Sequence, residues 1–443
     1  MEKLLEFDPI YLFIIVMGTF FIWIFTNILL RDLYSKLTIH VFTIGFLFYS
    51  GIGLSLIYAN KQYIISYFTY YLAFCIVILS ISRIRFKDNV NEYGIFDEII
   101  IKNWSIFRVL GFVYPFSLFL LLFFPNIHLI DLFKPWILFS DANSLDVFNK
   151  RLSLSNNYFY IIIGWITVLT RPFYFISLFK YKKKPFVFIL WVLVPFYIDI
   201  IAKGSLGRDD FIFPIVLIIF YLYTEKYITK TKLIGLIGIF CIIGVPLMNK
   251  LYFLRKGESY ATATFGGMFS EFLNQEATFP LYYDLTVNIS NFLNPSDFLL
   301  WLFTLPIPNF LLPNYNPPLV NEIYTYARLG MEMGDPGYYI VVPSWLGEAF
   351  MFYGGNLSWL HGILIAIIIG IFIKFFKSNL VLKFWFIYFL IDMLRYLRSV
   401  SQEFLAQSIN SSILFFAVVF ALVIIRKQKI FGRDKINVND VEF

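Results

Sequence analysis

Long apolar stretches alternate with short polar segments over most of the chain. A membrane-spanning helix needs about 20 predominantly apolar residues. By that criterion the pattern predicts about 11 spans, at 9–30, 37–59, 63–81, 106–124, 158–178, 186–202, 211–223, 233–248, 351–376, 381–398 and 412–425. The expected fold class is an all-α polytopic membrane protein with about 11 transmembrane helices and one long extracytoplasmic loop.

The long loop divides the chain into three parts. Residues 1–248 are expected to form a membrane bundle containing helices 1–8. Residues 249–348 form the loop, and residues 349–443 carry helices 9–11 and a basic cytoplasmic tail. The one long non-membrane segment is therefore the first place to look for a functional site.

The loop contains an apolar stretch at 298–313 that is interrupted by Pro306, Pro308 and Pro313. Proline removes a backbone donor and breaks a helix. Non-helical backbone at membrane depth is tolerated only where protein or a water-filled cavity covers it. We therefore expect a re-entrant or interfacial segment, or a lid packed over the outer side.

Lysine and arginine in short loops predict the orientation, because they favour the cytoplasmic side. The basic positions lie at 83–87, 180–184, 224–232, Lys374, Lys377 and 426–429. With eleven spans, the N-terminus is outside and the C-terminus inside. The outer face then receives 125–157, 203–210, 249–348 and 399–404. An even number of helices with the N-terminus inside is the alternative.

Composition supports a membrane protein. The chain is 59% hydrophobic, 21% aromatic and 15% charged, whereas soluble domains average about 25% charged residues. The formal charge of +7 fits the positive-inside bias, so no nucleic-acid partner is expected. Both cysteines lie in apolar runs, which excludes a disulfide framework and a cysteine-based metal site.

Several arginines are expected on the outer face, against the positive-inside bias. They are Arg208 in GSLGRDD, Arg255 in NKLYFLRKGE, Arg328 in the loop, and Arg395 and Arg398 at the outer end of the tenth helix, three and six residues after Asp392. The planar arginine fork binds phosphate bidentately, so a lipid-linked diphosphate is the expected ligand. Alternatively, each arginine pairs with a nearby carboxylate or reaches the lipid headgroups.

Three acidic residues are candidate bases. Glu348 lies where the loop returns to the membrane, and a partly desolvated carboxylate there could accept the proton of a sugar hydroxyl. Asp209 and Asp210 follow Arg208 and are rival candidates. The alternative for Glu348 is that it complements the dipole of its own helix, with Ser344 as the N-cap.

Charges inside membrane helices are functional candidates by default, which applies to Asp199 and Arg171. For Arg171 a structural contact with an aspartate of another helix is the preferred interpretation. His40, His128 and His361 are scattered, and His361 is expected to be packed or hydrogen-bonded. No nucleotide or zinc motif occurs, so neither a cofactor nor a metal is expected.

Taken together, these features resemble the Wzy-type polymerases, which join the oligosaccharide repeat units of bacterial surface polysaccharides. The resemblance is best over 203–370 and rests on many membrane helices, a large outer loop, GSLGRDD opening a helix, the arginine of YFLRKGE, and PSWLGEAFMFYGGNLSWLHG leading into a late helix. Many members have Gly-Ser-Arg-Gly at the glycine turn. Here Leu206 holds the arginine position and Arg208 follows two residues later.

The resemblance implies glycosyl transfer at the outer face of the bacterial inner membrane. The growing glycan would move from undecaprenyl diphosphate to the acceptor sugar of the next lipid-linked repeat. The expected catalytic residues are Arg208, Arg255, Glu348 and Asp209, and the expected substrate-binding residues are Arg395, Arg398, Arg328, Asp210 and Asp392. The expected partners are undecaprenyl-diphosphate-linked oligosaccharides and membrane lipids, with a chain-length regulator and a flippase as further candidates.

Two other classes remain open. A lipid-linked glycan ligase, or another polyprenyl-linked glycosyltransferase, would more typically carry a histidine in its large outer loop, and 249–348 has none. A flippase or transporter of lipid-linked sugars would have short loops and functional charges near the middle of the membrane. The missing histidine counts against the ligase, and the long outer loop and the outer-half charges count against the transporter.

Overall fold

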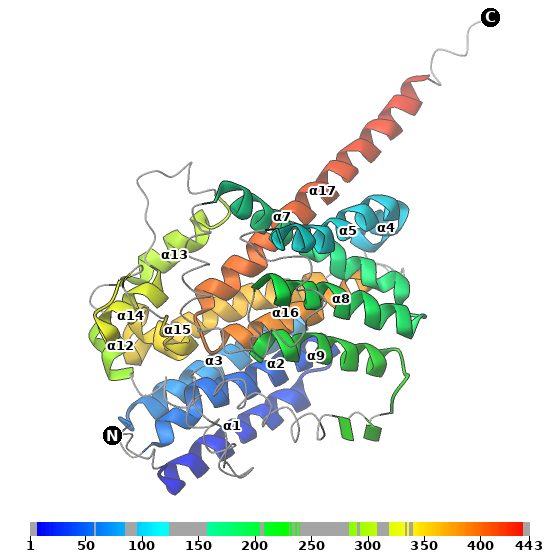
Figure 1. Cartoon of the computed structure of the whole chain (residues 1–443). Coiled ribbons are helices and arrows are strands. Elements are labelled where there is room, and N and C mark those ends of the chain that lie inside the picture. The colour runs from blue at the N-terminus through cyan, green and yellow to red at the C-terminus, as the bar shows by residue number, and fades with distance from the viewer. Residues whose placement is uncertain are drawn as a thin grey trace, which may run out of the picture.

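A computed structural model describes residues 7–56, 59–84, 95–123, 157–203, 208–229, 231–232, 235–236, 239, 283–289, 293–307, 319–332, 335 and 340–436; within these ranges the side chains of 95, 202–203, 208–212, 283–285 and 426–436 are not described. Almost all of the described residues are helical (Figure 1). The predicted all-α class is therefore confirmed.

Seven helices in the described ranges are long and apolar enough to cross a membrane. They are α1 (Pro9–Leu29), the span Leu33–Ser55, α3 (Tyr63–Arg83), α5 (Trp104–Leu121), the span Tyr158–Tyr181, α15 (Ser344–Lys377) and the span Ser401–Ile425. Large apolar side chains on α1 face outward, with Phe21 72% and Ile28 75% exposed. These helices indicate a multi-pass membrane protein.

Two of the seven spans are composite, and the other helices are shorter. The span Leu33–Ser55 consists of α2 (Leu33–Phe46), a π-helical turn and a 3₁₀ turn, and Tyr158–Tyr181 begins as α7 (Tyr158–Leu178). The shorter helices are α4 (Ile95–Lys102), α8 (Pro185–Lys203), α9 (Arg208–Thr224), α12 (Tyr283–Ile289), α13 (Pro295–Thr304), α14 (Val320–Leu329) and α16 (Lys383–Tyr396). The predicted segment 233–248 lies almost wholly outside the described residues. The helical bundle is therefore confirmed, and the number of crossings stays a prediction.

Side-chain caps explain where several helices begin. Asp8 accepts from the backbone N–H of Ile10 at 3.0 Å at the start of α1, and Asn157 accepts from that of Phe159 at 3.0 Å at the start of α7. Asn294 and Asp297 form a reciprocal capping box at α13. Each cap satisfies a donor that a helix N-terminus leaves free.

The last helix begins earlier than predicted. Residues 399–404 are expected to be an outer-face loop and the final span to start at 412, whereas α17 runs from Ser401 to Ile436. The difference arises because the polar first turn of α17 makes hydrogen bonds within the bundle, as described below. Its far end projects beyond the bundle (Figure 1).

Helix α3 and residues 355–377 of α15 pack side by side and run in the same direction. The Tyr70 hydroxyl lies 3.1 Å from Nδ1 of His361, and the Lys374 ammonium donates to the carbonyl of Ile84 at 3.0 Å. Gly362 leaves room for the backbone of Tyr70, because a Cβ there would lie 3.2 Å from the Tyr70 carbonyl oxygen. Early and late parts of the chain therefore form one core.

The loops predicted to face the cytoplasm meet at one end of this core. The buried carboxylate of Asp97 accepts from the backbone N–H groups of Leu380 at 2.8 Å and Val381 at 3.0 Å. Lys383 pairs with Glu225. These contacts join α4, α9 and α16 at the same end as Lys374.

Candidate functional site

A reversal of the chain at Gly354 folds the first part of α15 back on the rest. Gly354 has φ 69° and ψ 171°, a conformation essentially restricted to glycine. Thirteen residues of straight helix would separate residues 348 and 361 by about 20 Å, yet Nε2 of His361 lies 3.9 Å from Oε2 of Glu348. Residues 344–353 therefore form a half-helix that lies against 355–377.

The extended chain before residue 344 enters the bundle, and the half-helix leads back out. Trp345 lies 6.1 Å, between ring centroids, from Phe42, which stacks on Phe74 in the middle of α3. Phe350, later in the half-helix, lies 5.1 Å from Tyr63 at the start of α3. Residues 344–353 thus run antiparallel to α3 and form a re-entrant segment, at a place where the sequence indicates one continuous helix.

The extended chain that leads into the half-helix is paired through one side chain. Thr325 of α14 accepts from the N–H of Val341 at 3.0 Å, donates to the Asn321 carbonyl at 2.6 Å and lies 3.2 Å from the Val341 carbonyl. Thr325 and Val341 are both fully buried. Irregular backbone inside the bundle is tolerated here because protein satisfies its polar groups.

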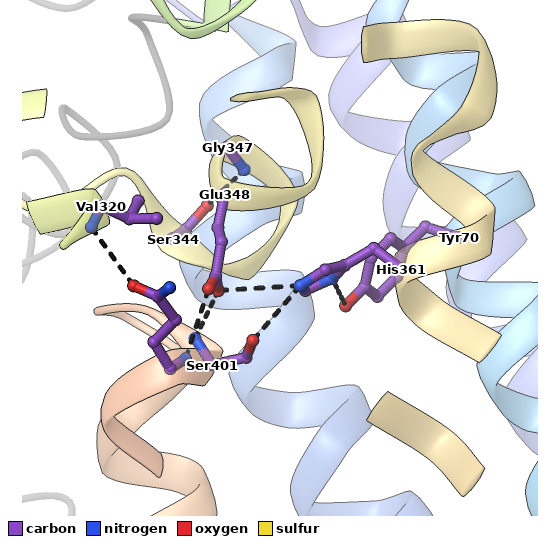
Figure 2. A network of polar contacts seen from close by, with 8 residues as sticks. Tyr70, Val320, Ser344, Gly347, Glu348, His361 and Ser401 are labelled. Atoms are coloured by element: carbon purple, nitrogen blue, oxygen red, sulfur yellow. Dashed lines mark hydrogen bonds and ion pairs between the residues drawn. The ribbon is translucent and has the colours of Figure 1, made fainter. Parts of the chain in front are cut away.

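Glu348 contacts the N-terminus of α17. Its carboxylate accepts from the backbone N–H of Ser401 and, at 3.3 Å, from that of Gln402 (Figure 2). The side chain is completely buried. A carboxylate at this position complements the positive end of the helix dipole and satisfies two donors. The helix that it complements is α17, whereas the sequence suggested its own helix.

A chain of hydrogen bonds continues from this point (Figure 2). Ser401 Oγ lies 3.2 Å from Nε2 of His361, and the Tyr70 hydroxyl lies 3.1 Å from the other ring nitrogen. His361 is fully buried, and Phe298 of α13 meets its ring edge-on, 5.0 Å away between centroids. His361 is thus packed and hydrogen-bonded, as predicted.

Helix α13 accounts for the first part of the apolar stretch 298–313. Its buried side chains, Phe298 and Trp301, face the bundle, while Leu300 and Phe303 are 50% and 76% exposed. The helix ends at Thr304, just before Pro306. Pro308 and Pro313 lie outside the described residues.

Helix α14 packs against the turn between α16 and α17. Asn321 donates to Ser399 at 3.2 Å and to Glu403 at 2.6 Å. Ser399 also donates to Glu403 at 2.6 Å. A helix of the predicted outer loop is therefore joined to the end of α16, directly beside Arg398.

The residues predicted to bind substrate at this end fall into two groups. Arg395 is exposed, with its guanidinium 5.4 Å from the Tyr396 ring, and Arg398 is partly buried. Arg328 is also partly buried and lies in the last turn of α14, where a cation complements the helix dipole. Asp392, by contrast, is buried at 4% exposure.

Asp392 belongs to a network inside the bundle. The Tyr388 hydroxyl accepts from Arg171 of α7 and hydrogen-bonds to Asp392. Asp392 and Asp199 both interact electrostatically with Arg171, which lies 5.9 Å from the Tyr114 ring centroid. Arg171 therefore does contact another helix, but its hydrogen-bonded partner is Tyr388, whereas the sequence suggested an aspartate.

The other predicted residues are not brought into view. Arg208, Asp209 and Asp210 form the first turn of α9, but their side chains are not described. Arg255 and His128 lie outside the described residues. Across the described residues no group of three or more His, Cys, Asp or Glu side chains could hold a metal ion.

Sequence reasoning missed the polar residues that hold the site together. These are Tyr70, Asn321, Ser401, Gln402 and Glu403. One signal was present: Ser399 followed three residues later by Gln402 matches the capping-box pattern that marks the start of a helix. The tyrosine and the asparagine carry no comparable local signal.

The chain was compared with known proteins in three ways. No protein-family model, no curated protein and no solved structure matches it. The interpretation of the site therefore depends on its own geometry and on the residue patterns described above.

Proposed function

We propose that this protein polymerises lipid-linked oligosaccharide repeat units at the outer face of the bacterial inner membrane. The observation that carries the proposal is the junction of α14 with the α16–α17 turn. There, Asn321 contacts Ser399 and Glu403 immediately beside Arg398, one turn beyond the exposed Arg395. Arginines next to a loop helix at the end of α16 are suited to bind a diphosphate headgroup that enters from the membrane.

The proposed step is a displacement at the anomeric carbon of the donor glycan. The hydroxyl oxygen of the acceptor sugar forms the new bond as the bond to the diphosphate oxygen breaks. Undecaprenyl diphosphate leaves with the bonding electrons, and the hydroxyl proton passes to a base. Arginines stabilise the developing charge on the leaving group. Asp209 is the preferred base, because the Glu348 carboxylate is already occupied by two backbone donors.

A transporter of lipid-linked sugars is the second candidate. The network of Arg171, Tyr388 and Asp392 inside the bundle favours it, since carriers place functional charges within the membrane. The structural interpretation of this network and the transport interpretation predict different outcomes for gene deletion.

Deletion of the gene tests the function directly. Electrophoresis of the surface glycan is expected to show single capped repeat units and loss of the ladder, because chain growth stops while export continues. Total loss of surface repeats would instead establish a transporter. Long polymer that is not attached to its final acceptor would establish a ligase.

Arginine variants test the site. Replacing Arg208, Arg255 or Arg398 with alanine or lysine is expected to lower chain elongation about 100-fold or more, as removal of a group that stabilises transition-state charge does. Ladders made in the deletion strain carrying each variant measure the effect. Arg31→Ala is the control, because Arg31 is exposed just after the C-terminal end of α1, which is predicted to lie on the cytoplasmic side. Normal ladders together with normal membrane insertion would refute the diphosphate role.

A further inference from the structure

Two helices begin near each other inside the bundle without a capping side chain from the residue before them. Leu319 precedes α14 and Val400 precedes α17, and neither side chain can accept a hydrogen bond. The first N–H groups of a helix have no partner within the helix. At these two positions the acceptors come from other elements.

The two sets of contacts are arranged in series. Glu348 accepts from the N–H groups of Ser401 and Gln402 and so caps α17. The Gln402 side chain in turn accepts from the N–H of Val320 at 3.2 Å and so caps α14. The position of α14 therefore depends on Gln402, whose backbone is held by Glu348.

The next residue of α17 strengthens the link. Glu403 accepts from Asn321 at 2.6 Å, while Asn321 also reaches Ser399 at 3.2 Å. Val320 is fully buried and Asn321 is 6% exposed. Buried polar groups that lose their partners are costly, so α14 and the α16–α17 turn are held as one unit.

The surroundings of Glu348 fit a fixed acceptor. Its half-helix is fully buried from Ser344 to Met351. His361 and Ser401 contact each other at 3.2 Å on one side of the carboxylate, and Phe298 meets the imidazole edge-on. The backbone N–H groups that the carboxylate occupies form an anion site with an internal occupant.

We propose that Glu348 is a positioning residue. Its carboxylate holds the N-terminus of α17, which through Gln402 and Glu403 seats α14 and orients the turn that carries Arg398. This inference rests on the proposed function for the ligand, a polyprenyl diphosphate. The mechanical coupling between Glu348 and α14 can be measured without any ligand.

Hydrogen exchange on the full-length protein in nanodiscs tests the coupling. In Glu348→Ala, the amides of 401–402 and also those of 320–321 are expected to exchange about tenfold faster or more, because both caps weaken together. Tyr326→Phe, on the exposed side of α14 and away from its first turn, is the control and should leave exchange unchanged. Unchanged exchange at 320–321 in Glu348→Ala would overturn the proposal.

Binding of undecaprenyl diphosphate tests the consequence for the site. Glu348→Ala is expected to weaken binding about tenfold, Glu348→Gln less, because an amide oxygen still accepts one N–H, and added formate should restore binding to the alanine variant. Gln402→Leu breaks only the link to α14, so it should reproduce the defect even if Glu348→Ala does not fold. Wild-type affinity in Gln402→Leu would refute the coupling. Absence of binding to the wild-type protein would refute the proposed function while leaving the exchange result intact.

Discussion

Replacing Gly354 with valine is expected to unfold the re-entrant half-helix and abolish function. Gly354 has φ 69° and ψ 171°, and holding a non-glycine residue there costs about 1–3 kcal/mol. Valine is stiff at the Cβ branch and adds to the strain. Loss of the reversal would draw Glu348 away from α17 and leave the N–H groups of Ser401 and Gln402 without their acceptor.

Thermal unfolding of the purified protein in detergent measures this effect, and the neighbouring glycine provides a matched control. Gly355 has ordinary backbone angles, and a Cβ added there would be in normal contact, 3.6 Å from Oγ of Ser66. Gly355→Ala should therefore melt like the wild type, while Gly354→Val melts several degrees lower. Among the residues that the structure describes, and apart from the adjacent backbone, no atom lies within 4 Å of a Cβ added at Gly354, so the cost is one of backbone conformation. Equal melting temperatures for the two variants would contradict the prediction that Gly354 is required for the reversal.

Replacing Arg171 with leucine is expected to destabilise the bundle strongly. Asp392 is 4% exposed, hydrogen-bonds to the Tyr388 hydroxyl that accepts from Arg171, and interacts electrostatically with Arg171. Removing one partner of a fully buried ion pair costs about 3–5 kcal/mol, which is an upper bound here because Arg171 is only partly buried while Asp392 stays buried. We expect the free energy of unfolding to fall by up to that amount.

The double variant Arg171→Leu with Asp392→Asn should recover much of the loss, since asparagine is neutral and can still bond Tyr388. Denaturant titrations of both variants supply the comparison, with the exposed Lys180→Leu as the control for loss of a cation. A single variant as stable as the wild type would show that the network does not stabilise the bundle. That outcome would strengthen the transporter as the alternative function.

Helix positions were largely predictable because the length of an apolar run reports directly on burial in lipid. The predicted 158–178 coincides with α7, and 63–81 falls two residues short of the end of α3. The shorter helices α8 and α9 were found for the same reason. What the runs do not report is how helices approach one another, so the pairing of α3 with α15 had no sequence signal.

The reversal at Gly354 escaped prediction for a physical reason. The residues on both sides of the glycine pair are apolar, so hydropathy indicates one continuous helix through the turn. A positive φ at Gly354 becomes favourable only when residues 344–353 have a place to pack. That place is provided by α17, whose Ser401 is 53 positions from Glu348.

Glu348 illustrates how far local reasoning reaches. An acidic residue near a helix start predicts a dipole contact, and Glu348 makes one. The identity of the helix is a tertiary matter, because the carboxylate meets the N–H groups of α17. The arginines were chosen for their chemistry and their expected side of the membrane. Of these, Arg398 lies close to α14, because Asn321 of α14 donates to Ser399, the residue after Arg398.

The parallel pair of α3 and α15 has a consequence for how the protein is made. Tyr70 and His361 are 291 positions apart, so at about 5–20 residues per second the ribosome needs roughly 15–60 s to supply the second after the first. During that interval Tyr67 and Tyr71 can bond to Thr19 and Thr43 on helices already inserted. The hydrogen bond of Tyr70 can form only after His361 has been synthesised, so it marks a late stage of assembly.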